Sequence, residues 1–444
     1  MFHYWNREVD LGLLPIWLGP KLKADIGRWL TIASRFVLNH AREIREGGLP
    51  ALLRKGRKLL LLLILPPFLP IVILIRVLRP IIVIRVGSLI SNQIGHFGAN
   101  TELYLCERDA GLQDSRAVDI FYHTAPVCNQ QLKKMWDRML HVSPFARPLA
   151  IVNRRLPGYA VHVIPMPSDK DPHGLLGRMR AHLSFTPEEE KVGQAGLRNL
   201  GIPEEASFVC FHSRDSAYLK ETFPDLNLRY HDYRDSSIHN CIAAAEELVC
   251  RGYFAIRMGA IVKEPLKITD PKIIDYAANG SRTDFMDIFL CARCRFFVGA
   301  AGGLNSIPRI FRRPIVFTNV VPLGRDHLLG NCGPNNLFIP KKLWLRESGR
   351  FMTFREIIES GAGGFFRTEQ YEQLGLEVVE NAPEEITAAV IEMEERLKGR
   401  WRTTEEDEDL QRRFWSFFDL SDLRDRQLLR VGAYFLRQNR EMLD

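Results

Sequence analysis

Charged and polar residues are concentrated directly after apolar strands, where a buried segment passes into a loop. The first group follows the strand-like run at 208–211 and contains His212, Ser213, Arg214 and Asp215. An arginine fork matches the oxygens of a diphosphate, and an aspartate can hold the guanidinium in place. The pattern predicts a site for a phosphorylated ligand, and a structural Arg–Asp pair that closes a loop is the alternative.

Two further groups lie at the ends of later strands. Arg257 ends the run at 254–257 and Gly259 follows it, and the segment 299–306 (GAAGGLNS) joins a strand to a helix. Small residues let backbone N–H groups face a phosphate at a helix N-terminus. This turn has neither the Gly-Lys-Ser/Thr ending of a Walker loop nor a G-x-G-x-x-G spacing. Its candidate ligand residues are Gly302, Gly303, Asn305 and Ser306.

Two histidine-containing segments complete the candidate site. The segment 230–237 (YHDYRDSS) contains His231 and Arg234, and it is either a ligand-binding loop or an ordinary helix cap. In the segment 92–100 (NQIGHFGAN), His96 lies between glycines after the first strand, with Asn92 nearby. A histidine in this position can act as general base toward a hydroxyl group, or it can merely order its loop.

The sequence predicts no cofactor and no metal requirement. Cys291 and Cys294 form a single CxxC, whereas a structural zinc site needs four ligands. No Asp-x-Asp stands at a strand end, where it would suggest a metal-bound diphosphate. The eight cysteines show no paired framework, so we expect reduced thiols.

The elements that position these residues alternate between short strands and longer helices. Apolar runs of strand length recur at 81–86, 118–122, 159–164, 208–211, 254–257, 273–275, 296–298 and 315–318. Such alternation predicts parallel βαβ units, which form doubly wound sheets. Because ligands bind outside the carboxyl ends of strands in such sheets, we expect two α/β domains that face a cleft.

The expected parts of the chain are a basic amphipathic region, two α/β domains and a helical tail. The first domain is expected at 80–200, the second at 201–400, and the tail at 401–444 is expected to pack back on the first domain. Within the first domain we expect a loop at 87–100 and a helix from 101 to 109.

Residues 1–79 are expected to associate with a membrane. The run at 59–75 (LLLLLILPPFLPIVILI) has no charge, but Pro66, Pro67 and Pro70 interrupt it, and a membrane-spanning helix needs about 20 apolar residues. Basic residues flank both ends, which favours both ends on the cytoplasmic side. We predict a re-entrant or in-plane element; a buried core segment is the alternative.

Composition limits the classes of partner. The chain has 444 residues, 46% of them hydrophobic and 25% charged, which is an average globular composition. Its 60 Lys and Arg exceed its 53 Asp and Glu by seven. This surplus is too small for a dedicated nucleic-acid binder, and it suits phosphate groups in a cleft and an anionic membrane surface.

From about 80 to 401 the sequence resembles a family of bacterial glycosyltransferases encoded among surface-polysaccharide genes. The segments that carry the resemblance are 94–105 (IGHFGANTELYL), 210–219 (CFHSRDSAYL), 230–240 (YHDYRDSSIHN), 256–266 (IRMGAIVKEPL), 270–290, 307–319 and 381–397. The resemblance implies a GT-B fold, in which two Rossmann-like domains face a cleft. The turn at 212–215 is also similar to the His-x-Arg-x-Asp turn of GT-B fucosyltransferases. Here Asp215 directly follows Arg214, which argues against GDP-fucose as the donor.

We therefore expect a glycosyltransferase at the cytoplasmic face of the bacterial inner membrane. It would move a sugar from a nucleotide-sugar donor to a lipid-linked or surface-polysaccharide acceptor. His96, Arg214 and Asp215 are the expected catalytic residues. Donor binding is expected of His212, Arg257, Gly259, Asp284, Asp287, Gly302, Gly303, Asn305 and Ser306. The alternatives are a nucleotide-sugar epimerase or hydrolase of the same fold, and a non-catalytic membrane scaffold of a polysaccharide assembly complex.

Overall fold

The computed structural model describes Gly48 and residues 65–114, 116–222, 224–300, 302–330, 335–421 and 428–444. The chain forms two compact units, of which one comprises 1–78 with 148–159 and the other 79–147 with 160–444. The expected boundary between 200 and 201 lies inside the second unit. Apart from Gly48, the part of the expected membrane region that precedes residue 65 lies outside the described residues.

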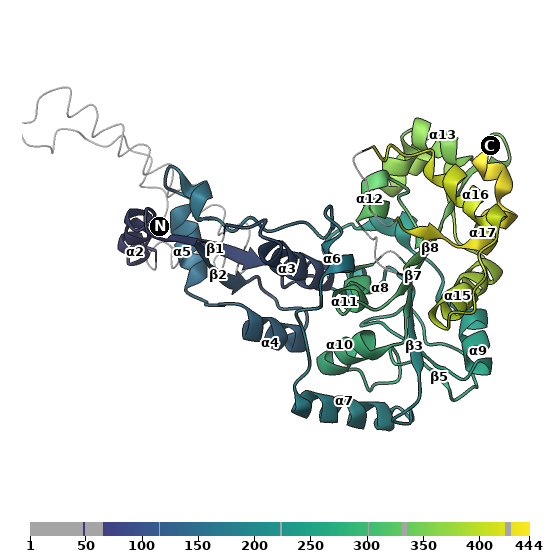
Figure 1. The fold of residues 1–444 in the computed structure, drawn as a ribbon, viewed down its shortest axis with the longest axis horizontal. Helices are drawn as coiled ribbons and strands as arrows, with labels where there is room; N and C mark the ends of the chain where they lie inside the picture. The colour runs from purple at the N-terminus through teal and green to yellow at the C-terminus, as the bar shows by residue number, and fades with distance from the viewer. Residues whose placement is uncertain are drawn as a thin grey trace, which may run out of the picture. The chain divides into compact units, whose positions relative to one another are not determined.

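The second unit is built on a seven-stranded parallel sheet with the order β12-β8-β7-β6-β3-β4-β5 (Figure 1). Its strands are β3 (Phe208–His212), β4 (Phe254–Arg257), β5 (Ile273–Ile274), β6 (Phe297–Ala300), β7 (Ile315–Val320), β8 (Leu337–Pro340) and β12 (Arg430–Val431). The βαβ pattern expected for 201–400 is thus confirmed as a mixed α/β structure with a large parallel sheet. Because all seven strands run the same way, their carboxyl ends share one edge.

The residues before 200 contribute a much smaller sheet to this unit. Strands β1 (Val83–Leu89) and β2 (Ala117–His123) form a parallel pair in register from Val83↔Ala117 to Leu89↔His123. The prediction of a third strand at 159–164 is wrong. Tyr159–His162 is a 3-10 helix, η2, and only Val163 forms a bridge, with Val86. Gly158, at φ +70°, turns the chain just before this segment, and Pro165 limits its extension.

Helix α3 (Ile94–Asp109) begins seven residues earlier than expected, so the predicted loop at 87–100 is shortened. Gly95 and Gly98, the two glycines that suggested a loop, lie where α3 packs closely on the segment that begins at Gly303. An ideal Cβ on Gly95 would lie 2.9 Å from the Cα of Gly303, and one on Gly98 would lie 3.3 Å from the Cδ1 of Ile307. Packing of α3 on α11 (Ser306–Ile310) therefore overrides the low helix propensity of glycine.

The other helices of this unit cover the sheets and mostly agree with the sequence pattern. Several begin at side-chain caps: Asn129 caps α4, Thr283 caps α10, and Thr186 and Thr404 form capping boxes for α7 and α16. They are α4 (Gln130–Met139), α6 (Leu175–Arg178), α7 (Pro187–Asn199), α8 (Ala217–Thr222), α9 (Ile242–Cys250), α10 (Asp284–Arg293), α12 (Arg325–Leu329), α13 (Phe354–Glu359), α14 (Thr368–Gln373), α15 (Pro383–Leu397), α16 (Glu405–Trp415) and α17 (Ala433–Gln438). Helix α5 (Ala146–Asn153) begins in this unit and ends in the other.

Shorter elements connect these helices and strands. Strands β10 (Arg350–Phe351), β9 (Lys342–Leu345) and β11 (Leu376–Val379) form a small antiparallel sheet. Further 3-10 helices are η3 (Arg229–Arg234), η4 (Ile238–Cys241), η5 (Gly303–Asn305), η6 (Ala362–Gly364) and η7 (Arg440–Leu443).

The described part of the C-terminal tail joins the large sheet rather than the first predicted domain. Strand β12 pairs with β8, and α17 contacts α15 and α16. The expectation that 401–444 packs back on residues 80–200 is therefore corrected. Trp415 and Phe414 explain the difference, because both are buried and their rings contact Phe338 of β8.

The other compact unit contains α2 (Phe68–Val77), which begins directly after Pro66 and Pro67. Val72 of α2 packs with Leu65 and Val152 in a small apolar cluster. The Arg76 guanidinium donates to the Asn153 side chain at 2.8 Å and to the Pro157 carbonyl at 2.6 Å. Among the described residues, no helix is both long and apolar enough to cross a bilayer.

We expect Gly95→Ala to lower the free energy of unfolding by about 1–3 kcal/mol, because its methyl group would meet backbone atoms of Gly303. The matched control is Gly364→Ala, since a Cβ on Gly364 would meet no atom within 4 Å. Urea unfolding of both variants measures the difference. Equal effects of the two substitutions would contradict the close packing of α3 on this turn.

Candidate functional site

A cavity of about 1030 Å³ lies at the carboxyl ends of β3, β4 and β6, and the first turn of α3 faces these strand ends across it. Every residue of the sequence-predicted site except Arg257 lines this cavity. These are Asn92, His96, His212, Arg214, Asp215, His231, Arg234, Gly259, Asp284, Asp287, Gly302, Gly303, Asn305 and Ser306. Residues more than 200 positions apart in sequence thus share one cavity. Their roles remain predictions.

Arg214 is held in the cavity wall by Asp235 rather than by Asp215. Its Nη1 atom donates to the Asp235 carboxylate and, at 3.2 Å, to the carbonyl of His231. Its side chain is only 11% exposed, and its side-chain hydrogen bonds to the described residues all involve Nη1. Nε and Nη2 therefore keep donors for a ligand.

Asp215 orders the loop around the site. One carboxylate oxygen accepts from the N–H of Ala217 at 2.8 Å, and the other accepts from the N–H of Lys263 at 3.0 Å. The expected pairing of Asp215 with the Arg214 guanidinium is not formed. The Arg–Asp pair does exist, but its acid comes from the segment 230–237.

Positive charge is concentrated around Arg214. Lys341, which is buried, donates to the carbonyls of Tyr233 and Asp235 at 3.1 and 2.5 Å. Burial lowers the pKa of Lys341 to about 8, and burial and the charge of Arg214 lower the pKa of Arg234. Burial also raises the pKa of Asp235 to about 6, against the opposing effect of Arg214. Arg214, Arg234 and Lys341 thus lie near Asp235, and the carboxylates of Asp215 and Asp232 are close enough to raise the pKa of Asp235 as well.

The glycine-rich turn lies beside His212. An ideal Cβ on Gly302 would lie 3.5 Å from the His212 ring, at van der Waals distance, so the turn and the ring are neighbours. Burial lowers the pKa of His212 to about 4, and its buried Nδ1 has no hydrogen-bond partner within the described part of the chain. The amide of Asn305 donates to the Ala300 carbonyl at 2.9 Å and shapes the turn. His212 is thus a neutral imidazole in the wall next to the turn.

His96 lies on the first turn of α3 rather than in a loop. Its Nδ1 is 3.2 Å from Oδ1 of Asn100, and the Asn100 amide donates to the Pro167 carbonyl at 2.9 Å. Because a carbonyl can only accept, that bond fixes the amide and turns its oxygen toward His96. Nδ1 is then the donor, and Nε2 keeps a lone pair. Sequence reasoning missed Asn100, although its spacing of four residues from His96 fits one helix face.

The N-terminus of α3 adds partial positive charge to the same wall. Asn92, Gln93, Ile94, Gly95 and His96 all line the cavity. No side chain of the described residues caps this helix, and no acidic residue lies in its first turn. The first N–H groups of a 16-residue helix therefore face the cavity without a protein acceptor at the cap.

Arg257 does not line the cavity. It is 2% exposed, and its Nη1 donates to the Glu264 carbonyl at 2.8 Å and to Asp275 at 3.2 Å. The geometry therefore gives Arg257 a role in holding the loop after β4, and we leave it out of the ligand site.

The two aspartates of α10 line the cavity from the side. The Asp284 carboxylate accepts from the N–H of Gln130 at 2.8 Å, so it joins α10 to α4. Asp287 accepts from Tyr276 at 3.1 Å and from Arg282 at 2.7 Å. Burial raises the pKa of Asp287 to about 6, although Arg282 opposes this.

Several residues that line the cavity were not predicted from the sequence, because they do not follow a predicted strand. Lys170 lies in an irregular loop, Arg309 is on α11, and His327 is on α12. Arg309 donates to the carbonyls of Asp169 and Gly330. Burial lowers the pKa of His327 to about 4. Nothing in their local sequence distinguishes them from surface residues.

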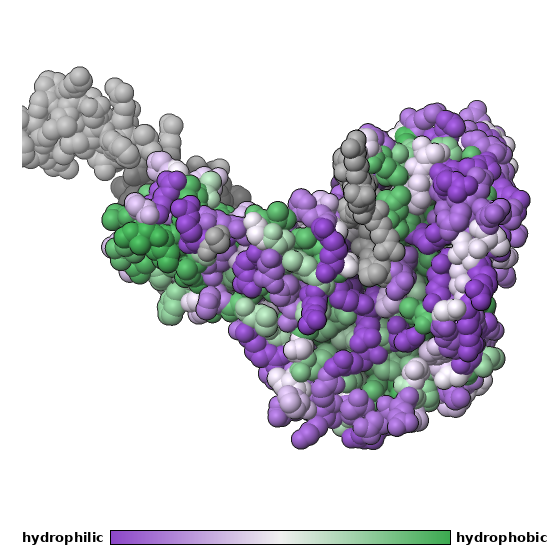
Figure 2. All heavy atoms as spheres, in the orientation of Figure 1, coloured by the Kyte–Doolittle hydropathy of each residue, from purple (hydrophilic) through white to green (hydrophobic). Residues whose placement is uncertain are grey.

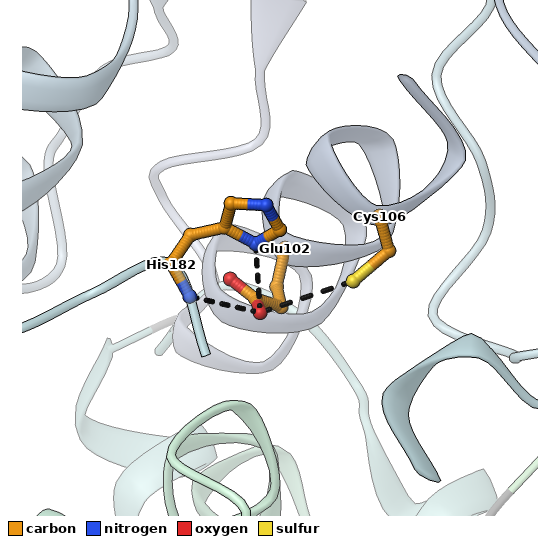
Figure 3. A group of neighbouring side chains, drawn as sticks. All are labelled: Glu102, Cys106 and His182. Atoms are coloured by element: carbon orange, nitrogen blue, oxygen red, sulfur yellow. Dashed lines mark hydrogen bonds and ion pairs between the residues drawn. The ribbon is translucent and has the colours of Figure 1, made fainter. Parts of the chain in front are cut away.

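A second cluster of titratable residues lies farther along α3, outside the cavity. Figure 3 shows Glu102 and Cys106 on consecutive turns of α3, with His182 beside them. Glu102 is fully buried; its Oε1 is 3.1 Å from the Nδ1 of His182 and accepts from Arg312 at 2.6 Å. Nε2 of His182 lies 3.0 Å from Asp109. The cluster ties α3 to the residues that follow α11.

Glu102, Cys106 and His182 are also potential metal ligands, since one ligand atom from each lies within 4.8 Å of the others. The Arg312 guanidinium donates to Oε1 of Glu102, whereas the buried Oε2 has no hydrogen-bond partner among the described residues. Burial by itself would lower the pKa of His182, but hydrogen bonds to Cys106, Glu102 and Asp109 and the charge of Glu102 raise it to about 10. Two cationic side chains thus already neutralise Glu102.

Comparison with known proteins gives only distant likenesses. No protein-family model matches the sequence, and no curated protein matches it. Among solved structures, the chain is similar to a family 9 glycosyl transferase of Veillonella parvula DSM 2008, with 12% identity over 71% of this chain and 96% of that one and a TM-score of 0.40.

Two Escherichia coli structures are also similar. For ADP-heptose lps heptosyltransferase II the identity is 13%, the coverage 57% of this chain and 90% of that one, and the TM-score 0.32. The iron-containing dodecameric glycosyltransferase TibC of strain H10407 has 12% identity over 56% of this chain and 61% of that one, with a TM-score of 0.31. These neighbours are glycosyltransferases, but at such TM-scores the likeness carries no argument, and the proposals below rest on the cavity.

We expect His182 to make stability depend on pH in the alkaline range. Because its pKa is raised from 6.5 to about 10, its contribution is fully present below pH 6.5 and is lost as the pH rises toward 10. The loss should be about 2 kcal/mol after allowance for partial solvation. Urea unfolding of the wild type and of His182→Gln at several pH values measures it. If the difference in free energy of unfolding between the two proteins stays constant from pH 6.5 to 10, this expectation is wrong.

We also expect the purified protein to carry no stoichiometric metal at the Glu102 cluster, because Arg312 supplies the countercharge. Elemental analysis of the wild type and of Cys106→Ser tests this expectation. A bound transition metal that is present in the wild type and lost in Cys106→Ser would contradict it.

Proposed function

We propose that the chain is a glycosyltransferase of the GT-B type, which transfers a sugar from a nucleotide-sugar donor held in the cavity to an acceptor hydroxyl. The observation that carries the proposal is the charge of the wall around Arg214. There, Arg214 is oriented by Asp235 while its Nε and Nη2 keep their donors. Arg234 lines the same cavity, and the buried Lys341 donates to the Asp235 carbonyl. A diphosphate would accept hydrogen bonds from the Nε and Nη2 atoms of Arg214.

The donor phosphates would lie between Arg214 and the turn at 302–306, facing the N-terminus of α3. There the leaving phosphate gains negative charge as the glycosidic bond breaks, and fixed donors stabilise that charge. The volume of about 1030 Å³ is at the upper end of small-molecule sites, which suits a nucleotide sugar together with part of an acceptor. Asp284 and Asp287, farther along the wall, would lie toward the nucleoside.

His96 would act as the general base. Asn100 accepts from its Nδ1, which leaves Nε2 toward the acceptor hydroxyl. Gly95, the residue before His96, packs on the Gly303 turn, so the base would stand near the donor phosphates. Removal of the hydroxyl proton in the transition state suits an inverting transfer.

The acceptor would be lipid-linked or part of a surface glycan, and the protein would act at the cytoplasmic face of the bacterial inner membrane. Support comes from α2, where Leu69, Ile71, Ile73, Leu74 and Val77 are between 41% and 68% exposed. Figure 2 shows this hydrophobic surface over α2. An apolar helix face of this kind is suited to lying in a membrane interface.

The deciding experiment is a thermal-shift screen of the full chain against UDP-, GDP-, CMP-, dTDP- and ADP-sugars. Stabilisation by one nucleotide class, lost in Arg214→Ala, supports the proposal. Incubation with the selected donor then separates the activities. Turnover that requires no acceptor identifies a hydrolase or epimerase, and no stabilisation by any donor refutes the nucleotide-sugar site.

Arg214→Lys should reduce transfer about 100-fold, because lysine keeps the charge but loses the fork that bonds Asp235 and phosphate oxygens together. Arg229→Lys is the matched control, since Arg229 lies in η3, the segment whose His231 carbonyl accepts from Arg214, but its side chain is 83% exposed. Steady-state rates with saturating donor measure the effect. A similar loss in both variants would mean that Arg214 acts only through the fold.

His96→Gln should reduce transfer by about 10²–10⁴-fold while leaving donor binding intact. Asn100→Asp should retain part of the activity and move the acid limb of the pH–rate profile to higher pH, because a carboxylate stabilises the protonated imidazole. Rates measured across pH and donor binding by calorimetry provide the two readouts. An unchanged profile in Asn100→Asp would contradict the assigned orientation of His96.

A further inference from the structure

We infer that a second, smaller cavity binds the phosphate group of an anionic membrane lipid. This cavity, of about 220 Å³, lies where β1 and β2 begin, in the same compact unit as the large cavity. It is lined by Arg79, Pro80, Ile81, Val83, Arg85, Asp114, Arg116 and Val161. The inference rests on the membrane association proposed above and assigns a specific site to it.

Arg85 gives this cavity a fixed cationic donor. Its side chain is 9% exposed, and its Nε and Nη2 atoms both donate to Asp119 at 2.6 Å. Tyr104 donates to the same carboxylate, which holds the pair in place. Because Nε and Nη2 are used, Nη1 is the group that Arg85 offers to a ligand. A guanidinium anchored in this way is well arranged to bind a phosphate oxygen.

Two exposed arginines add positive charge to the lining of this cavity. Arg79 is exposed, and the side chain of Arg116 is 79% exposed, with a long contact of 3.5 Å to Asp114. Asp119 neutralises Arg85, and Asp114 only partly neutralises Arg116. The cavity therefore keeps a net positive charge toward solvent.

The size and the rim of the cavity indicate a lipid rather than a nucleotide. About 220 Å³ is below the range of roughly 300–1,000 Å³ that is typical of small-molecule sites, but a single phosphate group needs less room. Ile81 and Val161 stand on the rim and are 82% and 37% exposed. A soluble anion gains nothing from such side chains, whereas a phospholipid places its acyl chains beside its phosphate.

The position of the cavity in the sequence agrees with this assignment. Only Leu78 separates the end of α2, at Val77, from Arg79. The chain thus passes from an exposed apolar helix directly to the arginines and to Ile81. Apolar insertion combined with cationic contacts to headgroups is the combination that gives stable interfacial binding.

The test is co-sedimentation of the full chain with two kinds of vesicle, one of phosphatidylcholine alone and one of equal parts phosphatidylcholine and phosphatidylglycerol. We expect tighter binding to the anionic vesicles. The affinity of the double variant Arg79→Ala/Arg116→Ala for the anionic vesicles should be at least about tenfold lower, and its binding to neutral vesicles should be unchanged. The control Arg355→Ala/Arg412→Ala removes the same charge from exposed sites on α13 and α16 and should bind like the wild type.

A third variant distinguishes failure of this inference from failure of the membrane proposal. Ile71→Ser/Leu74→Ser removes exposed apolar side chains of α2 and should weaken binding to both kinds of vesicle. A wild type that binds neither vesicle refutes membrane association itself. A wild type that binds both equally, or an equal loss in the two arginine variants, overturns only the headgroup site.

Inorganic phosphate separates the two sources of the anion. It is added without vesicles, and the melting temperature is measured for the wild type and for Arg79→Ala/Arg116→Ala. One outcome is that phosphate raises the melting temperature of the wild type but not that of the variant, while the variant binds vesicles as the wild type does. That result would assign the cavity to a soluble anion and overturn the lipid assignment. Melting of each variant in buffer alone verifies that its fold is retained.

Discussion

The close contact of α3 with the turn at 302–306 and with α11 is the constraint on which the large cavity depends. Gly95, Gly98 and Glu102 lie on one face of α3, and each contacts a residue of the segment from 303 to 312. The two glycines let the backbones approach, and the carboxylate fixes the far end through Arg312. This contact places the first turn of α3, with His96, opposite the carboxyl ends of the parallel strands.

The same arrangement explains why the cavity is suited to an anion. Parallel strands deliver their polar ends to one edge, and the uncapped N-terminus of α3 faces that edge. Burial then acts on the charges there, since it lowers the pKa of Lys341 and raises that of Asp235. Burial is the main cause of both shifts, and the neighbouring opposite charges only partly offset it.

Strand ends were predictable because their polar residues interrupt apolar runs, and so His212, Arg214 and Gly302 could be found from the sequence. The partners that hold the site residues come from other segments and could not be predicted from the sequence. Asp235 rather than Asp215 holds Arg214, and Asn100 orients His96 only because α3 begins at Ile94. Glycine propensity misplaced that helix start, and alternating apolar residues at 159–164 suggested a strand where Gly158 turns the chain. At the start of α3 a tertiary contact outweighed the local signal, whereas at 159–164 the flanking Gly158 and Pro165 limited strand formation.

Glu102 also limits how the chain can be divided. Its fully buried carboxylate is compensated by His182 and by Arg312, which lies 210 residues away in sequence. A fragment that ends near 200 would keep the carboxylate, lose the guanidinium and expose the glycine face of α3 to water. The segment before 200 is therefore not a module that can be expressed alone or exchanged between relatives. A chimera would have to carry α3 and α11 from the same parent.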